Sequence, residues 1–257
     1  MDRGQIKRGG QFLAPTMFTM GNMACGFYAV LAASIGDFAI AATAILCGIV
    51  FDMLDGRVAR LVKGESSFGV EFDSLADFMN FGVAPGFMMY ELFLKDYGSP
   101  GTIVAFLYVL CGGMRLARFN AVAQDGKSSK TSFQGLPIPA AAGFLATLVL
   151  LYTITERNSD ARTIGALMYV VPRIAQLAPF VMLVLGFLMI SNIPYAAFKQ
   201  VNLFDMRQVR PLIAVVVGGT LLYLFPQNAL FLLFLFYVLS GFTKLVFHPR
   251  PAEKPED

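Results

Sequence analysis

Apolar residues fill most of this chain in eight long stretches, and short polar connections separate them. A stretch of about 20 apolar residues is long enough to cross a bilayer as a helix. The pattern therefore predicts an all-α fold, a polytopic membrane helix bundle with about eight transmembrane helices. The expected helices are Phe12–Ile35, Phe38–Val62, Phe68–Leu94, Ile103–Val122, Leu136–Thr155, Ile174–Ile193, Pro211–Phe225 and Ala229–Phe247.

The polar segments predict where the bundle turns and where it ends. Gly64–Ser67 is the expected turn between the second and third helices, and Ala123–Gly135 is an expected mobile loop on the cytoplasmic side. Residues 1–247 are expected to form a single integral membrane domain, followed by a disordered cytoplasmic tail at 248–257. The first apolar stretch is longer than the core of a signal peptide, so we expect it to remain as a transmembrane helix.

Composition agrees with a membrane protein. The chain is 56% hydrophobic and 14% charged, with a mean hydropathy of +0.64, which excludes the usual soluble class. Its three cysteines, Cys25, Cys47 and Cys111, all fall in apolar stretches. This placement predicts buried free thiols rather than a disulfide framework or a zinc site. We expect no nucleic-acid partner.

Four aspartates interrupt the second and third apolar stretches, at Asp52, Asp55, Asp73 and Asp77. A carboxylate at membrane depth is costly, so ionisable residues there are functional candidates. Four carboxylates cannot crowd into a low-dielectric space unless cations neutralise them or they take up protons. Hard oxygen ligands favour Mg²⁺, Mn²⁺ or Ca²⁺ over zinc, and four carboxylates can hold two ions that clamp a phosphate.

The aspartates belong to the pattern D-x2-D-G-x2-A-R-x8-G-x3-D-x3-D. Because an α-helix turns about 100° per residue, each half of this pattern lies on one helix face, and the intervening turn brings the two faces together. Small residues on such a face give a substrate room, although they also serve helix packing alone, and an arginine can bind a phosphate oxygen. The first face carries Asp52, Asp55, Gly56, Ala59 and Arg60, and the second carries Gly69, Asp73 and Asp77.

This pattern resembles the signature of the CDP-alcohol phosphatidyltransferases, with every defining position matched. These integral membrane enzymes replace CMP on a CDP-linked lipid, or on another CDP-alcohol, with an incoming hydroxyl. The resemblance implies Asp52, Asp55 and Asp73 as metal ligands, and Asp77 as the general base that also contacts the second metal. It implies two ions of Mg²⁺ or Mn²⁺, with Ca²⁺ as a non-productive substitute, and a homodimer. The implied CDP-lipid-binding residues are Asp55, Gly56, Ala59, Arg60, Ser66 and Gly69, of which Ser66 is equally explained as a solvated turn residue.

Further runs resemble the phosphatidylserine synthase branch of this family. The resemblance implies transfer of a phosphatidyl group from CDP-diacylglycerol to L-serine, with Arg115 and Arg118 binding the serine carboxylate and Asn120 nearby. Two arginines in this position also fit anchors that touch lipid phosphates on the cytoplasmic side. The runs are Glu71–Asp77, Asn80–Pro85, Arg115–Asn120 and Phe133–Pro139, within a resemblance that extends from about Pro15 to Gly143.

Two alternatives stay open. The same chemistry could act on another acceptor, such as glycerol 3-phosphate, an inositol phosphate or choline. A cation-coupled transporter would use the aspartates as a relay, but they cluster at one membrane face rather than along its depth. One departure from the family pattern is Pro15-Thr16 where Pro-Asn is expected, so Thr16 is left out of the predicted site.

Basic residues orient the bundle. With the N-terminus in the cytoplasm, 16 of the 20 Lys and Arg fall on the inner side, which predicts that both termini are cytoplasmic. The aspartates then lie near the cytoplasmic ends of the second and third helices. We therefore expect an integral protein of the cell membrane whose active site faces the cytoplasm. The basic residues left outside are Lys95, Arg157, Arg162 and Arg173.

Overall fold

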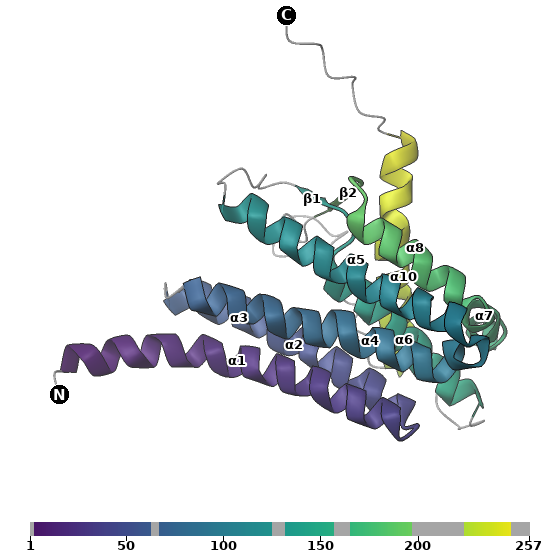
Figure 1. The fold of residues 1–257 in the computed structure, drawn as a ribbon, viewed down its shortest axis with the longest axis horizontal. Coiled ribbons are helices and arrows are strands. Elements are labelled where there is room, and N and C mark those ends of the chain that lie inside the picture. The colour runs from purple at the N-terminus through teal and green to yellow at the C-terminus, as the bar shows by residue number, and fades with distance from the viewer. Residues whose placement is uncertain (1–2, 63–66, 125–131, 157–164, 197–223, 248–257) are drawn as a thin grey trace, which may run out of the picture.

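The computed structural model describes residues 3–62, 67–124, 132–156, 165–196 and 224–247, and most of them are helical (Figure 1). The first two helices pack along each other as a hairpin. Its turn uses Gly36, whose φ of +81° favours glycine. The amides of Gly36 and Asp37 donate to the last carbonyls of the first helix at 3.1 and 2.9 Å. These helices are α1 (Arg3–Ser34), which starts before the predicted Phe12, and α2 (Phe38–Val62), which has the predicted bounds.

The third segment is one continuous helical rod that contains two π-helical stretches. Pro85 has no N–H, so the carbonyl of Phe81 loses its helical donor. The hydroxyl of Tyr108 donates to that carbonyl at 3.2 Å instead. The first π-helical stretch begins directly after Asp77, and such stretches often occur at functional sites. The rod consists of α3 (Ser67–Asp77), η1 (Phe78–Val83), α4 (Ala84–Met89), η2 (Tyr90–Leu94) and η3 (Lys95–Tyr97).

The most buried long helix is α6 (Ile138–Glu156), which packs against α2 and against α10 (Pro226–Phe247). It is apolar on all sides, as expected of a helix with neighbours all around it. The ring of Phe234 on α10 occupies the place that a side chain at Gly143 would take. Small residues therefore let α6 approach its neighbours closely.

The prediction of a single helix at Ile174–Ile193 is wrong. The structure has two helices there, α7 (Gly165–Gln176) and α8 (Ala178–Ile190), bent by 80° at the break between them. Pro179 stands in the first turn of α8, where its missing N–H favours a helix start over continuation of α7. The fourth helix, α5 (Ser99–Gln124), packs along α8 and is longer than predicted at both ends.

The all-α prediction misses one small sheet. Strand β1 (Ser132–Gln134) pairs antiparallel with β2 (Pro194–Ala196), with Phe133 opposite Tyr195. Three-residue strands carry too little alternation to be recognised from sequence. The end of the loop predicted at Ala123–Gly135 is therefore a strand, and its first residues belong to α5.

Some predictions fall outside the described residues. These are the middle of that loop, nearly all of the predicted helix Pro211–Phe225, and the tail at 248–257. Among the described residues the cysteines are free, as predicted. Burial was predicted for all three, but Cys47 is exposed, and Cys25 and Cys111 are only half-buried.

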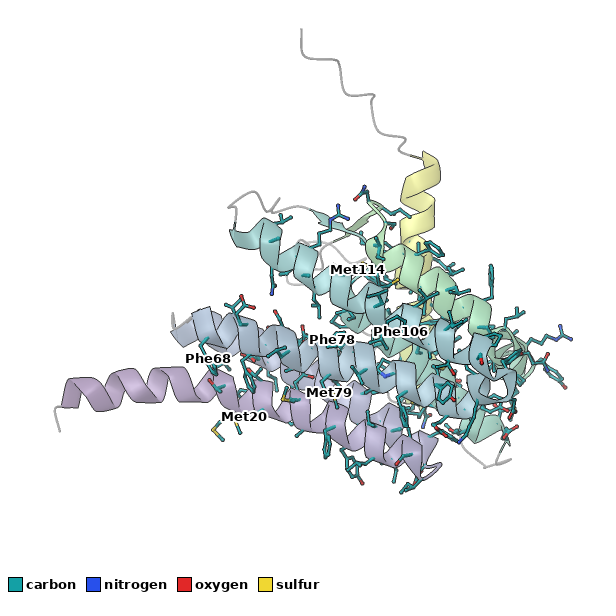
Figure 2. All side chains as sticks on the ribbon, viewed as in Figure 1. Met20, Phe68, Phe78, Met79, Phe106 and Met114 are labelled. Atoms are coloured by element: carbon teal, nitrogen blue, oxygen red, sulfur yellow. The ribbon has the colours of Figure 1, made fainter. Side chains whose placement is uncertain are left out.

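The described helices fit a bilayer. Four of them are long and apolar enough to cross a membrane, or five when the bent α7–α8 pair counts as one span. Large apolar side chains such as Met20, Phe68 and Phe106 are exposed on the outside of the bundle (Figure 2). Apolar surface of this kind is suited to contact with lipid tails.

Candidate active site

The carboxylates of Asp52, Asp73 and Asp77 meet between α2 and α3. Each offers one oxygen, and the three oxygens lie within 4.8 Å of one another. All three residues are half-buried. The two motif helices thus place their carboxylates together, as the helical spacing predicts.

A divalent cation fits this donor set. Carboxylates so close together repel each other unless a cation lies between them. The Oδ1 atom of Asp73 is buried and has no hydrogen-bond partner in the described part of the chain, so it is available to a ligand. Oxygen donors alone suit Mg²⁺ or Mn²⁺.

Helix α1 supports the motif from outside it. Thr19 donates a hydrogen bond to Oδ2 of Asp55, which is buried with 7% of its surface exposed. Asn22, three residues later on α1, donates from Nδ2 to Oδ1 of Asp77 at 3.0 Å. Neither residue belongs to the motif, and neither was predicted as part of the site. Their signal was two polar side chains spaced for one helix face inside an apolar stretch.

The residues proposed to bind the CDP-lipid are described only in part. A side chain at Gly56 would meet no described residue within 4 Å, so packing within the described structure does not explain the glycine. Gly69 lies half-buried near the start of α3. Ala59 and Arg60 belong to the last turns of α2, and their side chains lie outside the described structure, as does all of Ser66.

Arg115 is the acceptor candidate that interacts with an aspartate of the motif. It is buried on α5, with 9% of its surface exposed, and its Nε has no partner among the described residues. Its guanidinium interacts electrostatically with the carboxylate of Asp77. A buried guanidinium with a free N–H is suited to bind an anionic group.

The other two acceptor candidates contact different helices. Arg118 donates to the carbonyl of Ile190 at 3.2 Å and to the side chain of Asn192, where it binds the C-terminal end of α8. Asn120 donates to the hydroxyl of Ser74 on α3 at 2.9 Å. Asn120 and Ser74 line a cavity of about 340 Å³ between α3 and α5. The structure therefore does not gather the three candidates into one cluster.

A larger cavity, of about 630 Å³, lies at the other end of the rod that contains α3. Asp96, Tyr152 and Glu156 are on its wall, and none of the four motif aspartates is. Its size does not make it the active site, because the chemistry of the motif lies elsewhere.

Known proteins are similar to most of this chain. The family profile of the CDP-alcohol phosphatidyltransferases matches residues 12–239. A CDP-diacylglycerol–serine O-phosphatidyltransferase of Helicobacter pylori (strain J99) is 36% identical over 239 residues, which cover 92% of each chain. The enzyme of that name from Bacillus subtilis (strain 168) is 36% identical over 72% of this chain and 91% of its own. An archaetidylserine synthase of Methanothermobacter thermautotrophicus is 33% identical over 70% of this chain and 68% of its own.

This chain therefore belongs to the CDP-alcohol phosphatidyltransferase family, a family of transferases of phospholipid biosynthesis. The match extends well past Gly143, where the resemblance seen in the sequence ends, and takes in most of α10. Membership of an enzyme family sets aside the transporter alternative.

Proposed function

We propose that this protein is a phosphatidylserine synthase, which transfers a phosphatidyl group from CDP-diacylglycerol to the hydroxyl of L-serine and releases CMP. The observation that carries the proposal is the meeting of Asp52, Asp73 and Asp77 within 4.8 Å, in a chain similar over 92% of its length to an enzyme named for this reaction. A related archaetidylserine synthase by its name also makes a serine lipid, which supports serine as the acceptor.

The chemistry assigns a separate task to each group. The serine hydroxyl attacks the phosphorus that bears the diacylglycerol, and the bond from this phosphorus to the oxygen bridging the two phosphates breaks, so CMP leaves. Asp77 takes the hydroxyl proton as the new P–O bond forms. Asp52, Asp55 and Asp73, together with Asp77, would hold two ions of Mg²⁺ or Mn²⁺, whose charge offsets that of the pyrophosphate. We propose Ca²⁺ as a non-productive substitute.

The substrates are assigned to two sides of the aspartates. Gly56 lies where no described residue would meet a side chain on α2, and we propose that it binds the CDP moiety with Asp55, Ala59, Arg60, Ser66 and Gly69. On the other side, Arg115 would bind the serine carboxylate, because it is buried, interacts with Asp77 and has an Nε–H without a partner among the described residues. We also propose Arg118 and Asn120 for the acceptor site, but with less support than Arg115, because both already bind protein groups.

The membrane arrangement is also a proposal. We propose eight transmembrane helices in a single domain, residues 1–247, with both termini and the active site on the cytoplasmic side of the cell membrane. The distribution of Lys and Arg supports this orientation. Membrane lipids surround the protein, and we propose that it forms a homodimer and binds no nucleic acid.

An acceptor panel tests the function. Purified protein in detergent, with CDP-diacylglycerol and Mn²⁺, is given L-serine, glycerol 3-phosphate, inositol phosphate or choline, and CMP release is measured. We expect release with serine alone, and none with the Asp77→Asn variant. Release with another acceptor would keep the family chemistry and overturn serine as the substrate.

A further inference from the structure

Two buried asparagines form a hydrogen-bonded chain that ends on Asp77. Asn22 on α1 donates from Nδ2 to Oδ1 of Asp77 at 3.0 Å, and its own Oδ1 accepts from Nδ2 of Asn80 at 2.8 Å. Asn80, in the π-helical stretch η1, also donates to the carbonyl of Ile45 on α2 at 3.4 Å. Both asparagines are 0% exposed. The chain thus ties three helical segments together behind the carboxylate.

The partners determine which way each amide points. A side-chain amide has an accepting oxygen at one end and a donating nitrogen at the other. The carbonyl of Ile45 can only accept, so the nitrogen of Asn80 lies on that side, where it also meets the oxygen of Asn22. Asn22 must then present its nitrogen to Asp77. The opposite orientation would set an oxygen of Asn22 against a carboxylate oxygen, and two amide nitrogens against each other.

Two glycines make room for this chain. A side chain at Gly26 on α1 would lie 2.6 Å from Cα of Asn80, and one at Gly48 on α2 would overlap the Asn80 amide. Real Cβ contacts are not this short, so any larger residue would displace Asn80. Burying two amides among apolar helices costs free energy unless the amides are hydrogen-bonded. Space kept for both side chains therefore indicates that they have a role at this position.

We propose that Asn22 is a positioning residue for the transfer reaction, and that Asn80 sets the direction of the Asn22 amide. The inference rests on the proposed function, in which Asp77 is the general base. Asn22 holds Oδ1 of Asp77, which fixes the orientation of the carboxylate and leaves Oδ2 for the acceptor hydroxyl. A base held in one orientation needs less rearrangement in the transition state, so the effect falls on kcat.

The test uses the full-length protein with Asn22→Ala, Asn80→Ala and the double variant. The assay gives kcat and the KM for serine, and electron paramagnetic resonance of free Mn²⁺ gives the metal dissociation constant. We expect each single variant to lower kcat about 10- to 100-fold, the range for losing one hydrogen bond to a charged group. The KM for serine should change by less than about threefold, because neither Asn22 nor Asn80 binds substrate. The Mn²⁺ dissociation constant should rise by a smaller factor than that by which kcat falls, because Asp77 is one of four carboxylates that would hold the ions. The double variant should be no slower than Asn22→Ala, because both changes break one chain.

Control variants separate positioning from packing. Thr147→Val removes a buried hydroxyl whose bonds, among the described residues, stay within α6, and it should keep the wild-type kcat. Asn22→Leu keeps the size of the side chain without its donor, and it replaces Asn22→Ala if that variant does not fold. Full kcat in the Asn22 variants, multiplied losses in the double variant, or an equal loss of Mn²⁺ affinity would each overturn the inference. Asp77→Asn distinguishes the failures: if it stays active, the proposed base is wrong and this inference fails with it.

Discussion

Thr19 on α1 donates a hydrogen bond to Asp55 on α2, so the helix that precedes the motif holds one of its carboxylates in place. Asp55 lies outside the group of three carboxylates that meet within 4.8 Å, and it is the most buried of the four aspartates. A carboxylate fixed by a neighbouring hydroxyl keeps one orientation toward a bound ion. The motif is therefore only part of the site.

Thr19→Val tests this support. Valine keeps the shape of threonine and lacks the hydroxyl, so the Asp55 carboxylate loses its donor. We expect the Mn²⁺ dissociation constant to rise about 10-fold, at the lower end of the range for removing a residue that orients a metal ligand. Mn²⁺ titration of the purified variant measures this change. The matched control is Thr43→Val, which should bind Mn²⁺ like the wild type. Thr43 is exposed on α2, and in the described structure its hydroxyl donates to the carbonyl of Ala39 on the same helix.

Removal of the divalent ion should abolish activity reversibly. EDTA should stop CMP release, and excess Mn²⁺ or Mg²⁺ should restore it, while Ca²⁺ should bind without turnover. Mn²⁺ should also raise the melting temperature of the wild type, because an ion that binds only the folded state stabilises it. Asp73→Asn should lose this rise and exposed Asp96→Asn should keep it. Thermal stabilisation of Asp73→Asn equal to that of the wild type would remove Asp73 from the metal site.

Arg115→Ala should raise the KM for serine and leave the KM for CDP-diacylglycerol nearly unchanged. Loss of a charge-assisted bond to the serine carboxylate should raise the KM for serine about 10- to 100-fold and leave the KM for CDP-diacylglycerol within about threefold. Initial rates at varied concentrations of each substrate measure the two constants. Arg173→Ala, an exposed arginine on α7, is the control. An unchanged KM for serine in Arg115→Ala would place the acceptor elsewhere.

Gly56→Ala tests whether Gly56 makes space for the substrate or serves helix packing. Because a side chain there meets nothing within 4 Å, the melting temperature should not fall. The added methyl group should instead raise the KM for CDP-diacylglycerol, by about 10-fold if it obstructs the approach of the lipid phosphate to the backbone. Gly165→Ala has the same open surroundings on α7 and should change neither quantity. A fall in melting temperature with an unchanged KM would favour packing.

The hydrophobic pattern predicted the motif hairpin well. The bounds of α2 are those expected, and Asp52 meets Asp73 and Asp77 because the helical period places them on facing sides. Spacing alone does not place Asn120 beside Arg115, because five residues turn a helix by about 140° and so put the two side chains on different faces. The role of Asn120 at the acceptor site stays a prediction.

Other features depend on contacts between segments far apart in the chain. The bond from Thr19 to Asp55 joins residues 36 positions apart, and that from Asn22 to Asp77 joins residues 55 apart. No local pattern specifies such a pairing. The 80° bend before α8 was missed because an apolar stretch hides a break that Pro179 alone signals.

Oxygen labelling tests the central claim most directly. Protein, CDP-diacylglycerol and Mn²⁺ are incubated with L-serine that carries ¹⁸O in its hydroxyl, and mass spectrometry locates the label. Attack by the serine hydroxyl on phosphorus predicts phosphatidylserine that retains the ¹⁸O and CMP that contains none. CMP released without labelled phosphatidylserine would contradict phosphatidyl transfer to serine.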